Sequence, residues 1–149
     1  MREIKFRGKS DDGKWHYGDL LQYNDGTISI GVHGTYIDDG YSINDGYNCI
    51  IEVEEDSVGQ FTGIKDRNGN DIYEGDTLKW TVRNRSKNRK GTHKPYKKPQ
   101  ERIGTVVWSL GGLRLKSVDY PDAKWNYVLL NPQMNLEVIG NIHDKDSVE

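Results

Sequence analysis

Three oxygen-bearing side chains at alternate positions, Asp66, Asn68 and Asn70, are the first group in this sequence whose spacing suggests a ligand. An EF-hand calcium loop begins in this way, and it then requires Gly at its sixth position and Glu at its twelfth. Those two positions hold Asp71 and Thr77 here. The three residues are therefore better explained as part of a turn than as a calcium loop.

Transition-metal and thiol chemistry have little support. The four histidines are scattered along the chain: His16, His33, His93 and His143. The single cysteine, Cys49, has no Cys or His close to it in sequence, so no zinc-site spacing is present. Cys49 lies in a strand-like stretch, where a buried and unreactive thiol is expected. We therefore expect no metal, no cofactor and no nucleophilic cysteine.

Carboxylates offer a second kind of chemistry. An acidic run, Glu52, Glu54, Glu55 and Asp56, contains neighbours that could act as a general acid and base. Adjacent acids at the end of a strand are more typical of a solvated sheet edge. An enzyme remains one hypothesis, in which Asp66, Glu74 and Asp76 converge only in three dimensions.

The clearest chemical signal is the charge of residues 83–102, called the basic segment below. It holds nine basic residues and one acid, whereas the rest of the chain holds 12 basic and 22 acidic residues, a net charge of about −10. Several Lys and Arg on one flexible segment can neutralise phosphates, and a tyrosine can stack on a base. The candidate nucleic-acid contacts are Arg83, Arg85, Lys87, Arg89, Lys90, Lys94, Tyr96, Lys97, Lys98 and Arg102.

The positive charge of the basic segment also suits partners other than nucleic acid. The segment can dock on an acidic protein, including the acidic surface of another copy of this chain, or it can serve only to keep the protein soluble. The anionic remainder repels nucleic acid outside the segment, and no nucleic-acid recognition motif is present. These alternatives stay open on the sequence alone.

The sequence predicts that the elements that position these residues are strands. Turn dipeptides recur through the chain: Asp12-Gly13, Asp25-Gly26, Asp39-Gly40, Asp45-Gly46, Asn68-Gly69 and Gly111-Gly112. β-branched, aromatic or alternating stretches flank them at residues 4–7, 15–20, 27–30, 78–82, 104–108 and 137–140. No window of a dozen residues has a helical apolar stripe. The basic segment has Tyr96 as its one apolar residue and two prolines, so we expect a long flexible loop between two strands.

Size and composition limit the core. The chain has 149 residues, of which 34% are hydrophobic, and fifteen aromatic residues supply a modest core. No stretch approaches the ~20 apolar residues that span a bilayer, and the N-terminus lacks an apolar signal-peptide core. These features, with the single cysteine, predict a protein of the cytoplasm that is not bound to a membrane.

Three collinear motifs carry a family resemblance. The central motif runs from Ser57 to Leu78, the first covers residues 2–9 with Trp15–Gly18, and the last covers residues 137–144. Together they resemble the YopX family of small phage and prophage proteins. The resemblance implies a β-rich fold with an SH3-like C-terminal part, and it implies no activity.

The predicted fold is mainly β with few short helices. We expect an N-terminal β lobe at residues 1–56 and an SH3-like β-barrel part at residues 57–149, with the basic insertion at 83–102. Within the central motif we expect a turn at Asn68-Gly69, a return of Ile72 and Tyr73 to the core, and a bend in which Asp76 bonds nearby amides.

The function that follows is a phage or prophage accessory protein in the cytoplasm of the bacterial host. We expect it to be a non-enzymatic module that contacts nucleic acid through the basic segment. The first alternative is a structural or assembly protein that acts through self-association, as a homo-oligomer, or through an acidic partner. The second is the carboxylate enzyme described above.

Overall fold

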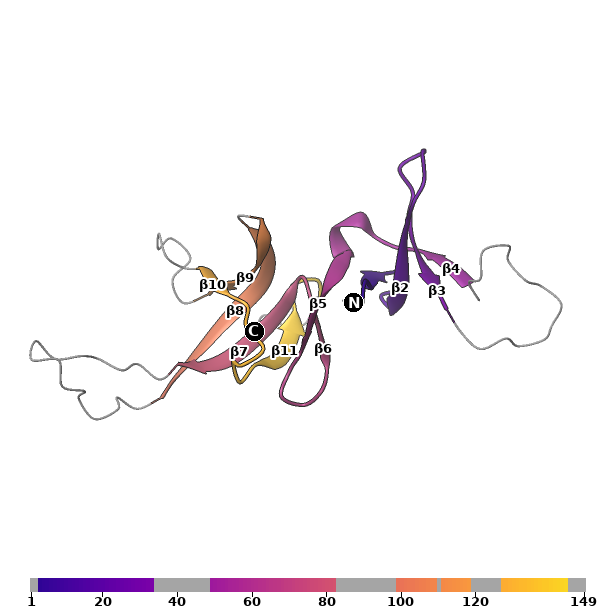
Figure 1. Ribbon diagram of the computed structural model, residues 1–149. Helices are drawn as coiled ribbons and strands as arrows, with labels where there is room; N and C mark the ends of the chain where they lie inside the picture. The colour runs from indigo at the N-terminus through magenta and orange to yellow at the C-terminus, as the bar shows by residue number, and fades with distance from the viewer. Residues whose placement is uncertain (1–2, 34–48, 83–98, 110, 119–126, 145–149) are drawn as a thin grey trace, which may run out of the picture. The chain divides into compact units, whose positions relative to one another are not determined.

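The computed structural model describes residues 3–33, 49–82, 99–109, 111–118 and 127–144, which are almost entirely strand and turn (Figure 1). This confirms the mainly β fold class. One turn of 3-10 helix, η1 (Glu55–Ser57), is the helical element of the described ranges, and none of their helices is long and apolar enough to cross a membrane. The strands are β1 (Phe6–Lys9), β2 (Trp15–Gln22), β3 (Ile28–Val32), β4 (Cys49–Glu52), β5 (Gly59–Lys65), β6 (Asp71–Tyr73), β7 (Asp76–Val82), β8 (Gln100–Ser109), β9 (Gly112–Ser117), β10 (Tyr127–Leu129) and β11 (Glu137–Asn141).

The chain divides into two compact units, Met1–Gly63 and Ile64–Glu149. The junction falls inside β5 at Gly63, whose φ of 81° is a conformation that glycine adopts without strain. The first half of β5 belongs to the N-terminal unit because it pairs with β1, Phe6 lying opposite Gln60. The end of β5 turns through residues 66–70 into β6 within the C-terminal unit.

The N-terminal unit is built from antiparallel neighbours in the order β4-β3-β2-β1-β5, and the same sheet continues to β6. Its hairpin turns lie where the sequence predicts them, because Gly13 and Gly26 have φ of 82° and 91°. Among its described residues, the buried apolar side chains are Ile30, Val53 and Phe61. The other two predicted turns, at residues 39–40 and 45–46, lie outside the described residues.

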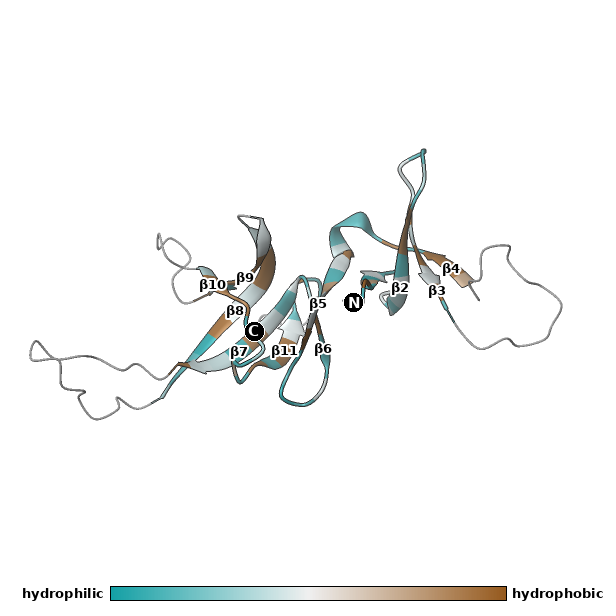
Figure 2. Ribbon diagram, viewed as in Figure 1, coloured by the Kyte–Doolittle hydropathy of each residue, from teal (hydrophilic) through white to brown (hydrophobic). Residues whose placement is uncertain are grey.

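The C-terminal unit carries a five-stranded antiparallel sheet in the order β10-β9-β8-β7-β11. Bands of hydrophobic and hydrophilic residues alternate along its strands, most clearly on β8 (Figure 2), because successive side chains point to opposite faces. One face carries the core, and Ile72 returns to it as predicted. The buried cluster is Ile72, Leu78, Trp80, Val106, Leu115, Leu130 and Leu136.

This sheet corrects the predicted barrel. In the described residues β10 and β11 are the two edges of an open sheet, and no pairing joins them. Ten-residue β8 pairs with β7 on one side and β9 on the other, and each outer strand is short. The sequence shows strands and turns, but closure depends on pairing between distant strands, which alternation does not encode.

Gly104 in β8 provides a test of this packing. A Cβ at Gly104 would lie 2.7 Å from the Lys116 carbonyl oxygen and about 3 Å from the Trp80 ring. We therefore expect Gly104→Ala to lower the free energy of unfolding by about 1–3 kcal/mol, since overpacking a filled site displaces backbone. Gly112→Ala is the matched control in the same sheet, because no atom lies within 4 Å of its added Cβ. Urea unfolding, monitored by tryptophan fluorescence, measures the difference in stability. Equal midpoints for the two variants would refute the close packing around Gly104.

Candidate nucleic-acid interface

The basic segment connects β7 to β8, which pair along the ladder from Thr77 opposite Thr105 to Val82 opposite Gln100. Most of its candidate contacts lie outside the described residues: Arg83, Arg85, Lys87, Arg89, Lys90, Lys94, Tyr96, Lys97 and Lys98. The described ends are close together, because Val82 lies opposite Gln100 in the ladder. The segment is therefore attached at both ends to one pair of strands.

The predicted loop boundary at 102 is wrong by a few residues. Residues Gln100–Arg102 are the first residues of β8, where they pair with Val82, Thr81 and Trp80 of β7. Arg102 is half-buried, and its Nη2 donates a hydrogen bond of 3.4 Å to Gln100 Oε1. The strand extends into the polar segment because β7 offers a partner for it, a tertiary effect that local polarity conceals.

Opposite the core, the C-terminal sheet has a second face, called the outer face below. Its residues alternate with the buried ones along β7, β8 and β9 and lie opposite one another in the ladders. Its first row is Leu129, Arg114 and Val107, its second is Tyr127, Lys116 and Thr105, and its third is Ile103, Lys79 and Glu137.

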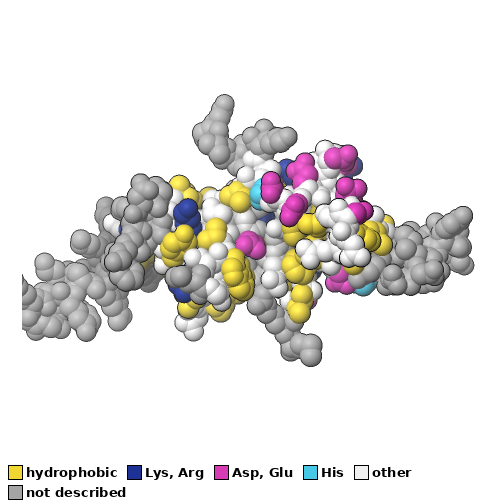
Figure 3. Space-filling view, turned by 90° about the horizontal axis from the view of Figure 1, so that it is seen from above, with side chains coloured by type: hydrophobic (Ala, Val, Ile, Leu, Met, Phe, Trp, Pro, Cys, Tyr) yellow, Lys and Arg dark blue, Asp and Glu magenta, His cyan; other side chains and the backbone are white. Residues whose placement is uncertain are grey.

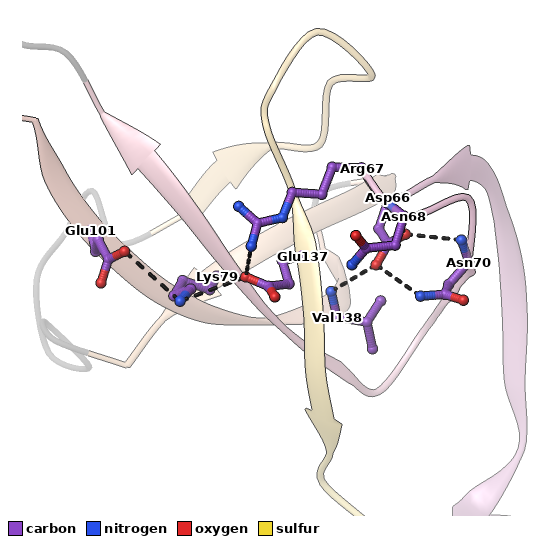
Figure 4. Close-up of polar contacts among 8 residues, drawn as sticks. All are labelled: Asp66, Arg67, Asn68, Asn70, Lys79, Glu101, Glu137 and Val138. Carbon is purple, nitrogen blue, oxygen red and sulfur yellow. Dashed lines mark hydrogen bonds and ion pairs between the residues drawn. The ribbon is translucent and has the colours of Figure 1, made fainter.

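One half of the outer face holds compensated charges (Figure 4). Lys79 Nζ lies 3.6 Å from Glu137 and 3.8 Å from Glu101, and Arg67 donates a hydrogen bond to the same Glu137 carboxylate. The hydrogen bond from Arg67 is the largest influence on Glu137 and lowers its pKa; burial opposes it, and the charges of Arg67 and Lys79 lower the pKa further. These exposed ion pairs each contribute little to stability.

The other half holds cations and apolar groups. Arg114 and Lys116 project from β9 beside Leu129 and Tyr127 of β10. Arg114 Nε donates to the Ser109 carbonyl oxygen, and no carboxylate of the described residues pairs with either cation. Sequence reasoning missed this group, although the alternation of Leu113, Leu115 with Arg114 and Lys116 was a detectable signal.

Asp66 is a turn-forming residue, which excludes the calcium loop as the role of this carboxylate (Figure 4). Its Oδ1 accepts hydrogen bonds from the amides of Asn68 and Asn70, at 2.8 and 2.9 Å. Its Oδ2 accepts from Asn70 Nδ2 and from the amide of Val138 in β11, both at 3.2 Å. Burial raises the pKa of Asp66, but the hydrogen bonds, led by those from the Asn70 and Val138 amides, together lower it. Its oxygens are occupied by N–H donors, which leaves no place for a cation.

The other two carboxylates of the enzyme hypothesis also bind backbone. Asp76 is 1% exposed, and its Oδ2 accepts a hydrogen bond of 2.8 Å from the Tyr73 amide, as the predicted bend requires. Glu74 Oε1 accepts from the Trp108 amide at 3.2 Å. In the described part of the chain, no three His, Cys, Asp or Glu side chains gather as a metal site. The convergence that the enzyme hypothesis requires has no support in these contacts.

The remaining candidates are dispersed. His16 contacts Ser10 Oγ and His33 contacts Asp19, each at 2.8 Å. Cys49 begins β4 as predicted for a strand, but it is exposed and not buried, because it stands at the outer end of an edge strand. His93 lies outside the described residues.

Charge is divided between the two units. Residues 1–63 hold five basic and twelve acidic residues, a net charge of −7, whereas residues 64–149 hold sixteen basic and eleven acidic residues, a net charge of +5. Acidic side chains gather on the face of the N-terminal unit that Figure 3 shows. The acidic residues Glu52, Glu54, Glu55 and Asp56 of this unit are exposed. A polyanion is therefore attracted to the C-terminal unit and repelled by the N-terminal unit.

The fold and the side-chain contacts define a two-unit, all-β protein with an open sheet whose strand connection is strongly cationic. The chain belongs to the YopX protein family, whose model matches residues 5–147. A search of the curated proteins found no match.

Proposed function

We propose that this protein is a non-enzymatic phage or prophage accessory protein of the bacterial cytoplasm that binds nucleic acid through the basic segment. One observation carries the proposal: eight basic residues are concentrated in the connection between two paired strands of the C-terminal unit, and a ninth, Arg102, lies near the start of the second strand. Neutralising several phosphates releases condensed counterions, and this release drives binding without a sequence-specific motif.

The distribution of the remaining charge supports this function. Outside the basic segment both units have more acidic than basic residues, so a polyanion has one strongly attractive region on this chain. The paired ends at Val82 and Gln100 keep that region on the C-terminal unit. Binding that depends on the segment is therefore expected to be sequence-tolerant and sensitive to salt.

Neutralising the segment is the direct test. We expect a variant with its nine Lys and Arg residues changed to Gln to bind a labelled 20-nucleotide DNA or RNA at least about 100-fold more weakly at low salt. Fluorescence anisotropy measures the affinity. The wild-type chain and the variant should unfold at similar urea concentrations, because eight of the nine changes lie outside the described strands.

A variant in which the order of residues 83–99 is permuted is the matched control, since it keeps the charge and changes the sequence. It should bind as the wild type does. Unchanged binding by the neutralised variant rules out the segment as the contact, and wild-type chain that binds only acidic protein favours the assembly alternative.

A further inference from the structure

We propose that one half of the outer face, formed by Tyr127, Leu129, Arg114 and Lys116, is a stacking platform that gives this protein a preference for single-stranded nucleic acid. The inference rests on the proposed function. It adds which form of nucleic acid the protein prefers, single-stranded or duplex.

The first observation is an exposed apolar group on an edge strand. Leu129 is 63% exposed and Tyr127 is 38% exposed, and both lie on the outer face. The buried cluster of this unit lies on the other face, so these side chains are not needed to complete it. An exposed aromatic ring on a sheet surface is available to a flat ligand.

The second observation is the position of the cations. Lys116 lies directly opposite Tyr127 in the β9–β10 ladder, and Arg114 lies directly opposite Leu129. Directly opposite residues on one face have Cβ atoms about 5 Å apart. Each apolar side chain is therefore next to a positive charge.

The third observation is the contrast with the other half of the face. There, Lys79 and Arg67 are paired with Glu101 and Glu137. Among the described residues, Arg114 and Lys116 have no such carboxylate partner. The platform is thus positive in charge, and it suits a ligand that is both flat and anionic.

Single-stranded nucleic acid has this chemistry. Its bases stack on aromatic side chains regardless of sequence, while its phosphates bind neighbouring Lys and Arg. Duplex bases are already stacked on one another and cannot reach Tyr127 without being unpaired. The platform therefore favours single strands, whereas the basic segment attracts either form.

The experiment uses the full chain and two probes, labelled oligo(dT) of 20 nucleotides and a 20-base-pair duplex, at one salt concentration. Tyr127→Ala is expected to weaken oligo(dT) binding about tenfold and to leave duplex binding unchanged. Tyr127→Phe keeps the ring and should bind as the wild type does. Tyr17→Ala removes an exposed tyrosine of the N-terminal unit and is the matched control.

A second readout locates the base directly. Photo-crosslinking with an oligonucleotide that contains 5-iodouracil should attach the base to Tyr127, identified by mass spectrometry, and Tyr127→Ala should lose that crosslink. Crosslinks confined to other residues contradict the platform.

The outcomes separate the two proposals. Equal oligo(dT) binding by wild type and Tyr127→Ala overturns the platform, while loss of binding on neutralising the basic segment would still support the proposed function. An equal loss for both probes overturns the strand preference. Wild-type chain that binds neither probe overturns both proposals, and conversion of a dimer to a monomer by Tyr127→Ala identifies the face as a self-interface instead.

Discussion

Replacing Asp66 by alanine is expected to lower the free energy of unfolding by about 3 kcal/mol, because a buried N–H group left without an acceptor costs about 1–3 kcal/mol. The Asp66 carboxylate accepts from three backbone amides and one side-chain amide. Two of those amides build the turn at residues 66–70, and the third belongs to Val138 in β11. The substitution therefore weakens a turn and a contact between residues 72 apart in sequence.

The stability that the Asp66 carboxylate contributes should depend on pH in a defined direction. The pKa of this carboxyl group is lowered in the folded protein, so its contribution is fully present above the unfolded pKa of about 3.9. That contribution is lost as the pH falls through the lower, folded pKa. The stability difference between wild type and Asp66→Ala should therefore shrink below about pH 4, as measured by urea unfolding at several pH values.

Asn68→Ala is the control for this prediction, because the exposed Asn68 takes part in the turn through its backbone amide. It should change stability by less than about 0.5 kcal/mol. If both variants lose the same stability, the carboxylate is not the residue that holds the turn.

Replacing Asp76 by alanine is expected to have a comparable effect, a loss of about 2–4 kcal/mol. Asp76 is almost fully buried and accepts hydrogen bonds from the Tyr73 amide and from Asn141 Nδ2, at 2.8 and 3.3 Å. It joins the bend after β6 to the end of β11, which lies opposite it in the ladder. Its removal leaves both donors buried without this acceptor.

Glu74→Ala provides the comparison within the same bend, since Glu74 makes its 3.2 Å hydrogen bond to the Trp108 amide at an exposed position. Glu74→Ala should lower the free energy of unfolding by less than about 1 kcal/mol. Thermal unfolding measured by circular dichroism can rank the two variants. A greater loss for Glu74→Ala would contradict the structural role given to Asp76.

The sequence predicted the structure well where it is set by residues that are close together in the chain. Asn68-Gly69 forms a turn with Gly69 at φ 87°, and Asp76 bonds the amide of Tyr73, as glycine and aspartate chemistry suggests. The open sheet, the start of β8 at Gln100 and the exposure of Cys49 were not predicted. Each of these depends on which strand lies beside which, and that information is distributed over distant residues.

The candidate interface also has one part that the sequence predicted and one part that it did not. Net charge is a property of composition, so the basic segment is visible in the sequence itself. Alternation along β9 indicates that Arg114 and Lys116 share a face, but their position beside Tyr127 and Leu129 follows only from the β9–β10 register. Residues on two strands share a face because of that register, and a shift of one residue would separate them.

The central claim is that the basic segment binds nucleic acid through phosphate neutralisation, and the salt dependence of binding tests it most directly. We predict that log Kobs for a 20-base-pair duplex falls linearly with log salt in the wild-type chain, with a slope of about −3 or steeper, and that the neutralised variant loses this dependence. A slope near zero for the wild-type chain, or an equally steep slope in the variant, would contradict the claim.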